Sequence, residues 1–198
     1  MSLKICTTEH MLATMRGLDF AQAWLPRIAA ERFATSSADG QVGHAPDPVP
    51  VIDTDLIWTN STGAWQNVHL ITHRAPRSTV SGNANTVVLA DALSWDIGLS
   101  PNAPLPTVTT DTIAGRLKTT PTLLGSQFHW YARLFNDWDD WQTIEHLGGV
   151  AAGETVQVRY QCLVSTPGEW RTGGSALQEA HARWVRLQLM AAPLLEVI

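Results

Sequence analysis

Residues 156–165 read Val-Gln-Val-Arg-Tyr-Gln-Cys-Leu-Val-Ser, and this stretch decides the fold. Val156, Val158, Tyr160, Cys162 and Val164 alternate with their neighbours at a period of two, which is typical of a half-buried antiparallel β-strand. Ala-Ala-Gly-Glu at 151–154 provides a turn before the strand, and Thr-Pro-Gly at 166–168 ends it. We therefore predict a strand over these ten residues.

A second alternation lies near the C-terminus. Val185, Leu187, Leu189 and Ala191 are every second residue until Pro193, which cannot donate a ladder hydrogen bond. The stretch 175–182 between the two strands has two interpretations. Its Ser and Gln, three residues apart, fit the capping box of a short helix, but the alanine-rich stretch can equally run extended.

The middle of the chain repeats this strand-and-turn pattern. Candidate strands cover 56–58, 65–73, 86–89 and 128–134, with Asn-Ser-Thr-Gly at 60–63 as a turn. Short strands about ten residues apart, without a βαβ rhythm, predict a mainly β protein. We expect an antiparallel, jelly-roll-like β-sandwich over 51–198.

Two segments do not fit a compact sandwich. Residues 1–50 are expected to form an extended N-terminal arm and linker, because Pro26 interrupts helical spacing over 19–33 and prolines and glycines crowd 35–50. Residues 100–125 contain four prolines among many threonines and predict a long central loop. This loop could be an arm that orders on a neighbouring subunit or a plain surface loop.

The composition excludes several classes of protein. The 198 residues carry a net charge of −5, and their Lys and Arg residues do not cluster, which argues against a nucleic-acid partner. The chain starts without a secretory signal pattern and has no run of 18 apolar residues, so membrane insertion is not expected. Cys6 and Cys162 form no disulfide framework, and Cys162 is expected to be a buried thiol.

Two groups of histidines and carboxylates are candidate metal ligands. His69 and His73 would lie roughly 13 Å apart on a strand, too far to share one ion. The acidic stretch 136–141, Asn-Asp-Trp-Asp-Asp-Trp, lacks the glycine and distal glutamate of a calcium loop, which favours a solvated turn. No metal site and no cofactor are expected.

Nine tryptophans provide the remaining candidates. We expect five of them to pack in or beside strands: Trp58, Trp65, Trp95, Trp130 and Trp184. The others of interest lie in polar loops, and with nearby carboxylates they are candidates for binding a protein partner or a glycan: Trp138, Trp141, Trp170, Asp137, Asp139 and Asp140. No nucleophile elbow, metalloprotease motif or phosphate loop accompanies them, so we do not expect an enzyme.

The order of short motifs along the chain resembles the minor tail proteins of long-tailed phages of actinobacteria. The motifs are Trp-Leu-Pro-Arg (24–27), Asp-Leu-Ile-Trp-Thr-Asn (55–60), Val-His-Leu-Ile-Thr-His-Arg-Ala-Pro-Arg (68–77), Ser-Gly-Asn-Ala-Asn (81–85), Ala-Gly-Glu-Thr-Val (152–156), Thr-Pro-Gly-Glu-Trp (166–170) and the ending at 179–193. From residue 55 to residue 193, the ordered pattern spans about two thirds of the chain. Residues 100–125 match little of the pattern.

The resemblance implies a structural component of the virion, in the tail or tail tip, assembled in the host cytoplasm. It implies no catalytic residues. The expected partners are other virion proteins and copies of the chain, as a trimer or hexamer in the family setting, with host contact as a further role. The alternative is a carbohydrate-binding module that recognises host envelope glycans through the loop tryptophans.

Overall fold

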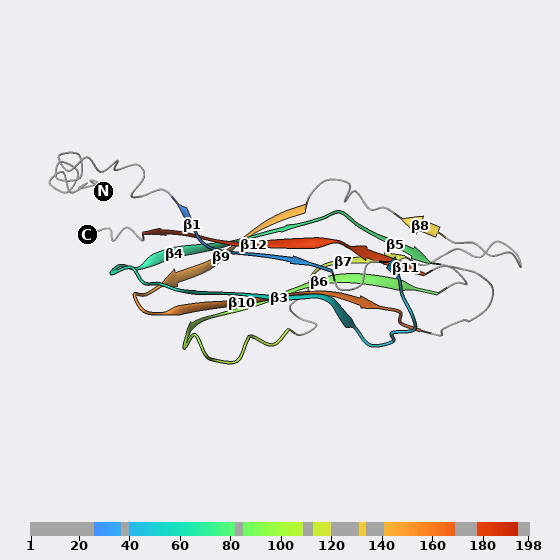
Figure 1. The fold of residues 1–198 in the computed structure, drawn as a ribbon, viewed down its shortest axis with the longest axis horizontal. Helices are drawn as coiled ribbons and strands as arrows, with labels where there is room; N and C mark the ends of the chain where they lie inside the picture. Colours follow the sequence, from blue (N-terminus) through green and yellow to red (C-terminus); the bar gives the residue numbers. More distant parts are fainter. Residues whose placement is uncertain are drawn as a thin grey trace, which may run out of the picture.

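The computed structural model describes residues 26–36, 40–81, 85–108, 113–119, 131–133, 141–168 and 178–193. Within these ranges all regular elements are strands (Figure 1). They are β1 (Arg27–Thr35), β2 (Gly40–Gln41), β3 (Val49–Thr59), β4 (Gln66–Arg74), β5 (Arg77–Ser81), β6 (Val87–Leu99), β7 (Ile113–Thr119), β8 (Tyr131–Arg133), β9 (Trp141–Val150), β10 (Thr155–Ser165), β11 (Glu179–Ala182) and β12 (Trp184–Pro193).

Two four-stranded antiparallel sheets face each other. The first has the order β1-β12-β4-β9 and the second β3-β10-β6-β7. The pairs β1 with β12, β3 with β10, β4 with β9 and β6 with β7 are nested, as if one long hairpin had been rolled into two layers. This is the topology of a jelly roll, and the prediction of a jelly-roll-like β-sandwich is confirmed.

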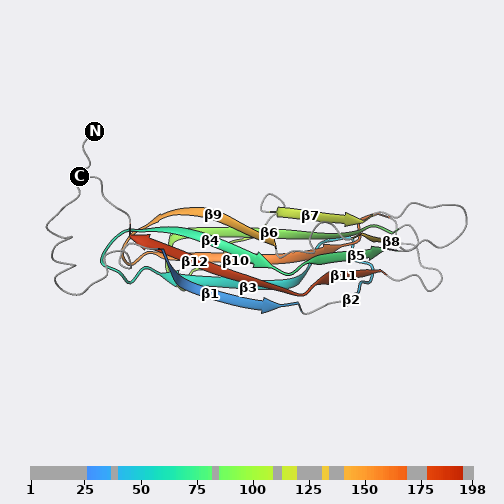
Figure 2. The ribbon, with the colours of Figure 1, turned by 90° about the horizontal axis from the view of Figure 1, so that it is seen from above.

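A smaller sheet, β2-β11-β5-β8, continues the first sheet along its length (Figure 2). β5 follows β4 after Ala75 and Pro76, and β11 precedes β12 with only Arg183 between them. The Ala75 amide still donates to the Trp184 carbonyl at 3.1 Å, whereas Pro76 has no amide hydrogen to offer. We call this interruption, residues 75–76 and 183, the sheet break.

The core lies between the sheets. Inward side chains of the first sheet, such as Leu70, Leu187 and Leu189, are fully buried against Val156 and Val158 of the second. Each strand contributes every second residue, as the pleat requires. Burial of apolar surface between the sheets, which contributes about 25 cal/mol per Å², is the main driving force for the two-layer arrangement.

Charged groups are buried beside the sheet break. The Asp91 carboxylate on β6 contacts Arg77 Nη2 at 2.5 Å and Arg74 Nε at 3.3 Å, and these arginines lie on either side of the break. The Arg77 guanidinium donates to the Tyr160 hydroxyl, which donates to Asp91. All four residues are at most 6% exposed. Asp91 therefore joins the two sheets where the first is interrupted.

Several sequence predictions are confirmed by the strand bounds. The alternating stretches near 156–165 and 185–191 are β10 and β12, and the predicted strand at 65–73 is β4. The stretch at 86–89 is part of the longer β6, and β8 covers 131–133 of the stretch at 128–134. The extended interpretation of 175–182 holds for β11, whereas residues 175–177 lie outside the described residues.

Two expectations about the loops differ from the structure. The expected arm over 1–50 includes β1, which pairs with β12 from Arg27 to Thr35, so the sandwich begins well before residue 51. The expected loop over 100–125 includes β7, which pairs with β6. Neither segment alternates regularly between apolar and polar residues. Both form strands because the neighbouring strand, β12 or β6, has backbone hydrogen-bonding groups along its edge that they can pair with.

The tryptophan expectations also need correction. Trp58 is partly buried against the core, as expected, and Trp184 is partly buried. Trp65 and Trp95 are 47% and 36% exposed, so they are surface side chains rather than packing residues of the core. Trp130 lies outside the described residues.

Replacing Asp91 tests the charged cluster. We expect Asp91→Ala to lower the free energy of unfolding by about 3–5 kcal/mol, because two buried arginines lose their carboxylate. Urea unfolding followed by circular dichroism measures the change. Asp53→Ala is the control, since its ion pair with Arg159 is partly exposed and is worth about 0–1 kcal/mol. Equal small losses in both variants would contradict the role given to Asp91.

Candidate interaction surface

The outward side chains of the first sheet form one continuous surface, which we call the first-sheet face. They alternate with the core residues on the same strands, so the pleat fixes their direction. The face consists of Ile28, Glu31 and Phe33 on β1; Trp184, Arg186, Gln188 and Met190 on β12; Asn67, His69, Ile71 and His73 on β4, with Trp65 just before it; and Ile144 and His146 on β9.

Strand register arranges these residues in rows across the sheet. One row runs from Ile28 through Met190 and His69 to His146. The next runs from Glu31 through Gln188 and Ile71 to Ile144. Cross-strand neighbours on one face contact each other directly, so the apolar groups form patches and are not isolated.

This face exposes more large apolar side chains than the rest of the described surface. Of the seven exposed large hydrophobic residues, four belong to it: Ile144 at 64%, Phe33 at 56%, Ile28 at 53% and Trp65 at 47%. Single exposed apolar residues are normal on soluble proteins, but a group of them on one rigid face indicates an interaction site.

Aromatic contacts fix part of the face. The Phe33 ring stacks on Trp184 with the ring centroids 5.8 Å apart, and the His73 ring meets Trp184 edge-on at 6.0 Å. Such stacked and edge-to-face pairs add about 0.5–1.5 kcal/mol beyond their buried area. The three side chains thus present a fixed aromatic surface.

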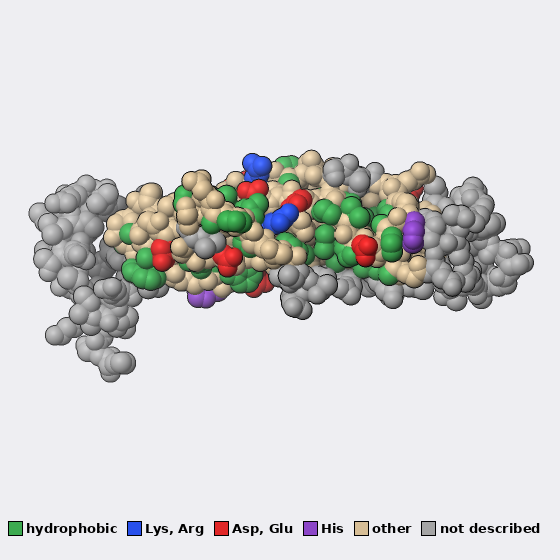
Figure 3. Space-filling model, turned by 90° about the horizontal axis from the view of Figure 1, so that it is seen from below, with side chains coloured by type: hydrophobic (Ala, Val, Ile, Leu, Met, Phe, Trp, Pro, Cys, Tyr) green, Lys and Arg blue, Asp and Glu red, His purple; other side chains and the backbone are tan. Residues whose placement is uncertain are grey.

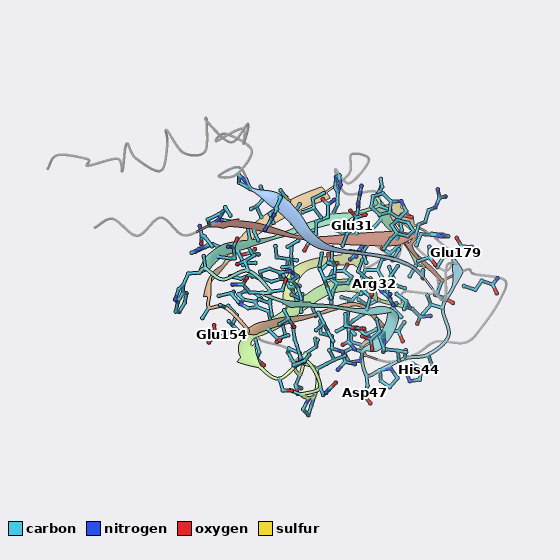
Figure 4. The ribbon with its side chains drawn as sticks, turned by 60° about the vertical axis from the view of Figure 1, so that its left-hand side comes forward. Glu31, Arg32, His44, Asp47, Glu154 and Glu179 are labelled. Atoms are coloured by element: carbon cyan, nitrogen blue, oxygen red, sulfur yellow. The ribbon has the colours of Figure 1, made fainter. Side chains whose placement is uncertain are left out.

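The charges of the first-sheet face neutralise each other. Arg186 donates two hydrogen bonds to the Glu31 carboxylate, at 2.8 and 3.0 Å, and Gln188 donates a third at 3.0 Å. The hydrogen bonds from Arg186 lower the pKa of Glu31 below its ordinary value. In Figure 4 Glu31 lies on the β1 side of the molecule, well away from Asp47 and Glu154. The described residues of this face carry no other Asp, Glu, Lys or Arg.

Two histidines of neighbouring strands lie together on this face. The His69 and His146 rings have centroids 4.8 Å apart, and Asn67 lies 2.6 Å from His146 Nε2. A β-bulge at Leu147 creates this pairing, and Gly148 accommodates it with a φ of 122°. His73 is on the same strand as His69, as expected. Among the described residues no group of three or more His, Cys, Asp or Glu could hold a metal ion.

On the outward face of the second sheet, the described side chains of β3, β10 and β6 are more acidic. Arg159 binds Asp53 through two hydrogen bonds at 2.9 and 3.1 Å, and Gln161 donates to the same carboxylate. The hydrogen bonds from Arg159 lower the pKa of Asp53. Asp55 and Asp96 lie on the same face with Ile57 and are opposite Arg159 and Gln157 in register. Figure 3, which views this side, shows acidic side chains spread along it.

Most of the site residues predicted from the sequence cannot be placed. Asp137, Trp138, Asp139, Asp140 and Trp170 lie outside the described residues. The Trp141 backbone begins β9 and pairs with Arg74. The sequence did not predict the first-sheet face as a unit. The sequence signal that could have indicated this face is Ile71, an apolar residue at the outward position between His69 and His73.

The buried cluster at the sheet break is not a reactive site. Burial raises the pKa of Tyr160, and the Asp91 carboxylate adds to this effect. Burial would lower the pKa of Arg77, but Tyr160, Cys162 and Asp91 raise it above its ordinary value. Burial also raises the pKa of Cys162 to about 12. These groups stay protonated and enclosed, so the cluster has a structural role.

Comparisons with known proteins identify a family without a known function. The family model described as "Domain of unknown function (DUF7172)" matches residues 1–196. The chain belongs to this family. No curated protein matches it. In the described residues no helix is long and apolar enough to cross a membrane.

A solved structure similar to this DUF7172 chain is the crystal structure of the CBM36-1 domain of a multidomain xylanase from the hindgut metagenome of Trinervitermes trinervoides. The two share 11% sequence identity over 79% of this chain and 95% of that chain, with a TM-score of 0.20. At this TM-score the comparison carries no argument about function.

The raised pKa of Cys162 predicts slow thiol chemistry. At pH 8.5 a thiol with a pKa near 12 is almost entirely protonated, and the thiolate is the reactive form. Labelling of a Cys6→Ser variant by iodoacetamide, followed by mass spectrometry, should therefore be at least 100-fold slower in the folded protein than in 6 M guanidinium. Because the folded pKa is raised, stability should fall as the pH rises from about 9 to 12. Rapid labelling of the folded variant would contradict the burial of Cys162.

Proposed function

We propose that this protein is a structural component of a phage virion, a minor tail or tail-tip subunit that assembles through protein contacts. The observation that carries the assembly role is the first-sheet face, with four large exposed apolar side chains and a single, internally neutralised ion pair. The assignment to a tail rests on the ordered motifs of the sequence, such as residues 68–77 and 179–193.

The fold is compatible with this role by analogy only. Double-sheet jelly rolls occur in viral capsid subunits and in lectins, so the fold by itself does not select a function. Such a subunit would be made in the host cytoplasm and kept on the particle. Its partners would be other virion proteins and copies of itself.

We propose no catalytic activity. The polar side chains that the structure brings closest together, Asp91, Arg77 and Tyr160, are buried and bonded to one another. The exposed ion pairs of the two outer faces, Glu31 with Arg186 and Asp53 with Arg159, saturate their carboxylates with arginine. A substrate would find no activated nucleophile in either arrangement.

A glycan is the alternative partner, and one observation favours it. The exposed Trp65 indole packs against Gly149, where an added Cβ would lie 3.2 Å from the ring, so the backbone supports an aromatic surface open to solvent. Sugar rings pack on such surfaces. Trp65 is not one of the loop tryptophans that the sequence favoured as site residues.

Purified particles test the virion role. Tryptic mass spectrometry of gradient-purified phage encoding this chain should detect it at a constant ratio to a known tail protein, and antibody labelling should mark the tail in electron micrographs. Host lysate without phage is the control. Absence of the chain from washed particles would contradict the proposal.

A glycan array tests the alternative. If the tryptophans bind sugar, wild-type protein should retain host envelope glycans. Either Trp65→Ala or the double variant Trp138→Ala, Trp141→Ala should then lose about 5-fold or more in signal, by analogy with the stacking of a nucleic-acid base on one aromatic side chain, which is worth about 1–3 kcal/mol. Identical blank arrays for all three proteins would exclude glycan binding. Ile57→Ala, on the opposite face, is a matched control.

A further inference from the structure

We propose that the first-sheet face binds the same face of a second copy of this chain, giving a dimer with twofold symmetry. The inference rests on the proposed assembly role and names its partner. In a twofold contact the same patch is used on both subunits, so the patch must be compatible with itself in charge, shape and area. The first-sheet face meets each of these conditions.

The area is sufficient. The sheet is four strands wide and its outer strands are nine and ten residues long. At about 4.8 Å between strands and 3.3 Å per residue, the face measures about 19 by 30 Å, or roughly 570 Å² per copy. Two copies would bury about 1,100 Å², which is above the roughly 1,000 Å² that a specific interface needs.

The charge pattern permits self-contact on this side of the molecule. Glu31 and Arg186 already neutralise each other through a two-pronged contact, so packing this face against itself leaves no unpaired charge in the interface. The described side chains of the second-sheet face lack this one-to-one pairing, because Asp53, Asp55 and Asp96 there outnumber Arg159.

The shape suits sheet-on-sheet packing. Two sheet faces pack about 10 Å apart with their strands nearly aligned, and their side chains interdigitate. Ile71 and Ile144 are cross-strand neighbours on this face, and Phe33 and Trp184 form a rigid stack nearby. The apolar side chains of one copy can therefore pack between those of the other.

Light scattering coupled to size-exclusion chromatography tests the dimer, with the full chain over a range from about 1 to 100 μM. We expect a mass of twice the 21.6 kDa of one chain at pH 7.5. Ile144→Glu should raise the dimer dissociation constant at least 100-fold, because a twofold contact buries the new carboxylate twice. Ile57→Glu is the matched control: it is also an exposed isoleucine on a strand, but on the second-sheet face, and should leave the mass unchanged.

Three results would overturn the proposed dimer: a monomer at every concentration, a cyclic trimer, or dissociation caused by Ile57→Glu and not by Ile144→Glu. Circular dichroism confirms that both variants fold. A dimer absent from phage particles would contradict the virion role alone, and a monomer found on particles would contradict the dimer alone.

Discussion

The bridge from Asp91 to Arg74 and Arg77 is the constraint on which the arrangement of the two layers depends. Sheet-to-sheet packing elsewhere is apolar and tolerates small shifts, whereas a buried carboxylate shared by two guanidinium groups tolerates few positions. The bridge lies beside the sheet break, where Pro76 interrupts the ladder of the first sheet. It therefore fixes the second sheet to both sides of the break.

The two outer faces of the sandwich have different chemistry because the outward positions, which are every second residue of each strand, hold different side chains. On β4 and β12 the outward positions hold two histidines, asparagine, isoleucine, glutamine, methionine, tryptophan and one arginine, whereas on β3 and β10 they include two aspartates, one arginine, two glutamines and one isoleucine. The fold does not require this difference, because either set of side chains would leave the core intact. The contrast between the faces is accordingly the best guide to how the protein meets a partner.

The sequence predicted the elements whose outward and inward residues differ in polarity. β10, β12 and β4 were found because buried apolar groups alternate with polar ones. β1 and β7 were missed, since edge strands keep one side open and need no alternation. Sequence reasoning also missed the charged bridge, although Asp91 stands inside the apolar run Val-Val-Leu-Ala-Asp-Ala-Leu at 87–93, where a lone carboxylate signals a buried partner. The first-sheet face required the register, because its residues come from four separate strands.

The nested pairing of the first and last strands has a mechanical consequence. Arg27 at the start of β1 is opposite Ala191 near the end of β12, so the two ends of the sandwich fold leave from the same pole. A load applied through both ends would peel β1 from β12 one hydrogen bond at a time, rather than shearing all of their bonds together. A subunit built in this way carries tension well only if its neighbours grip it across the broad faces of the sandwich, and not by its ends.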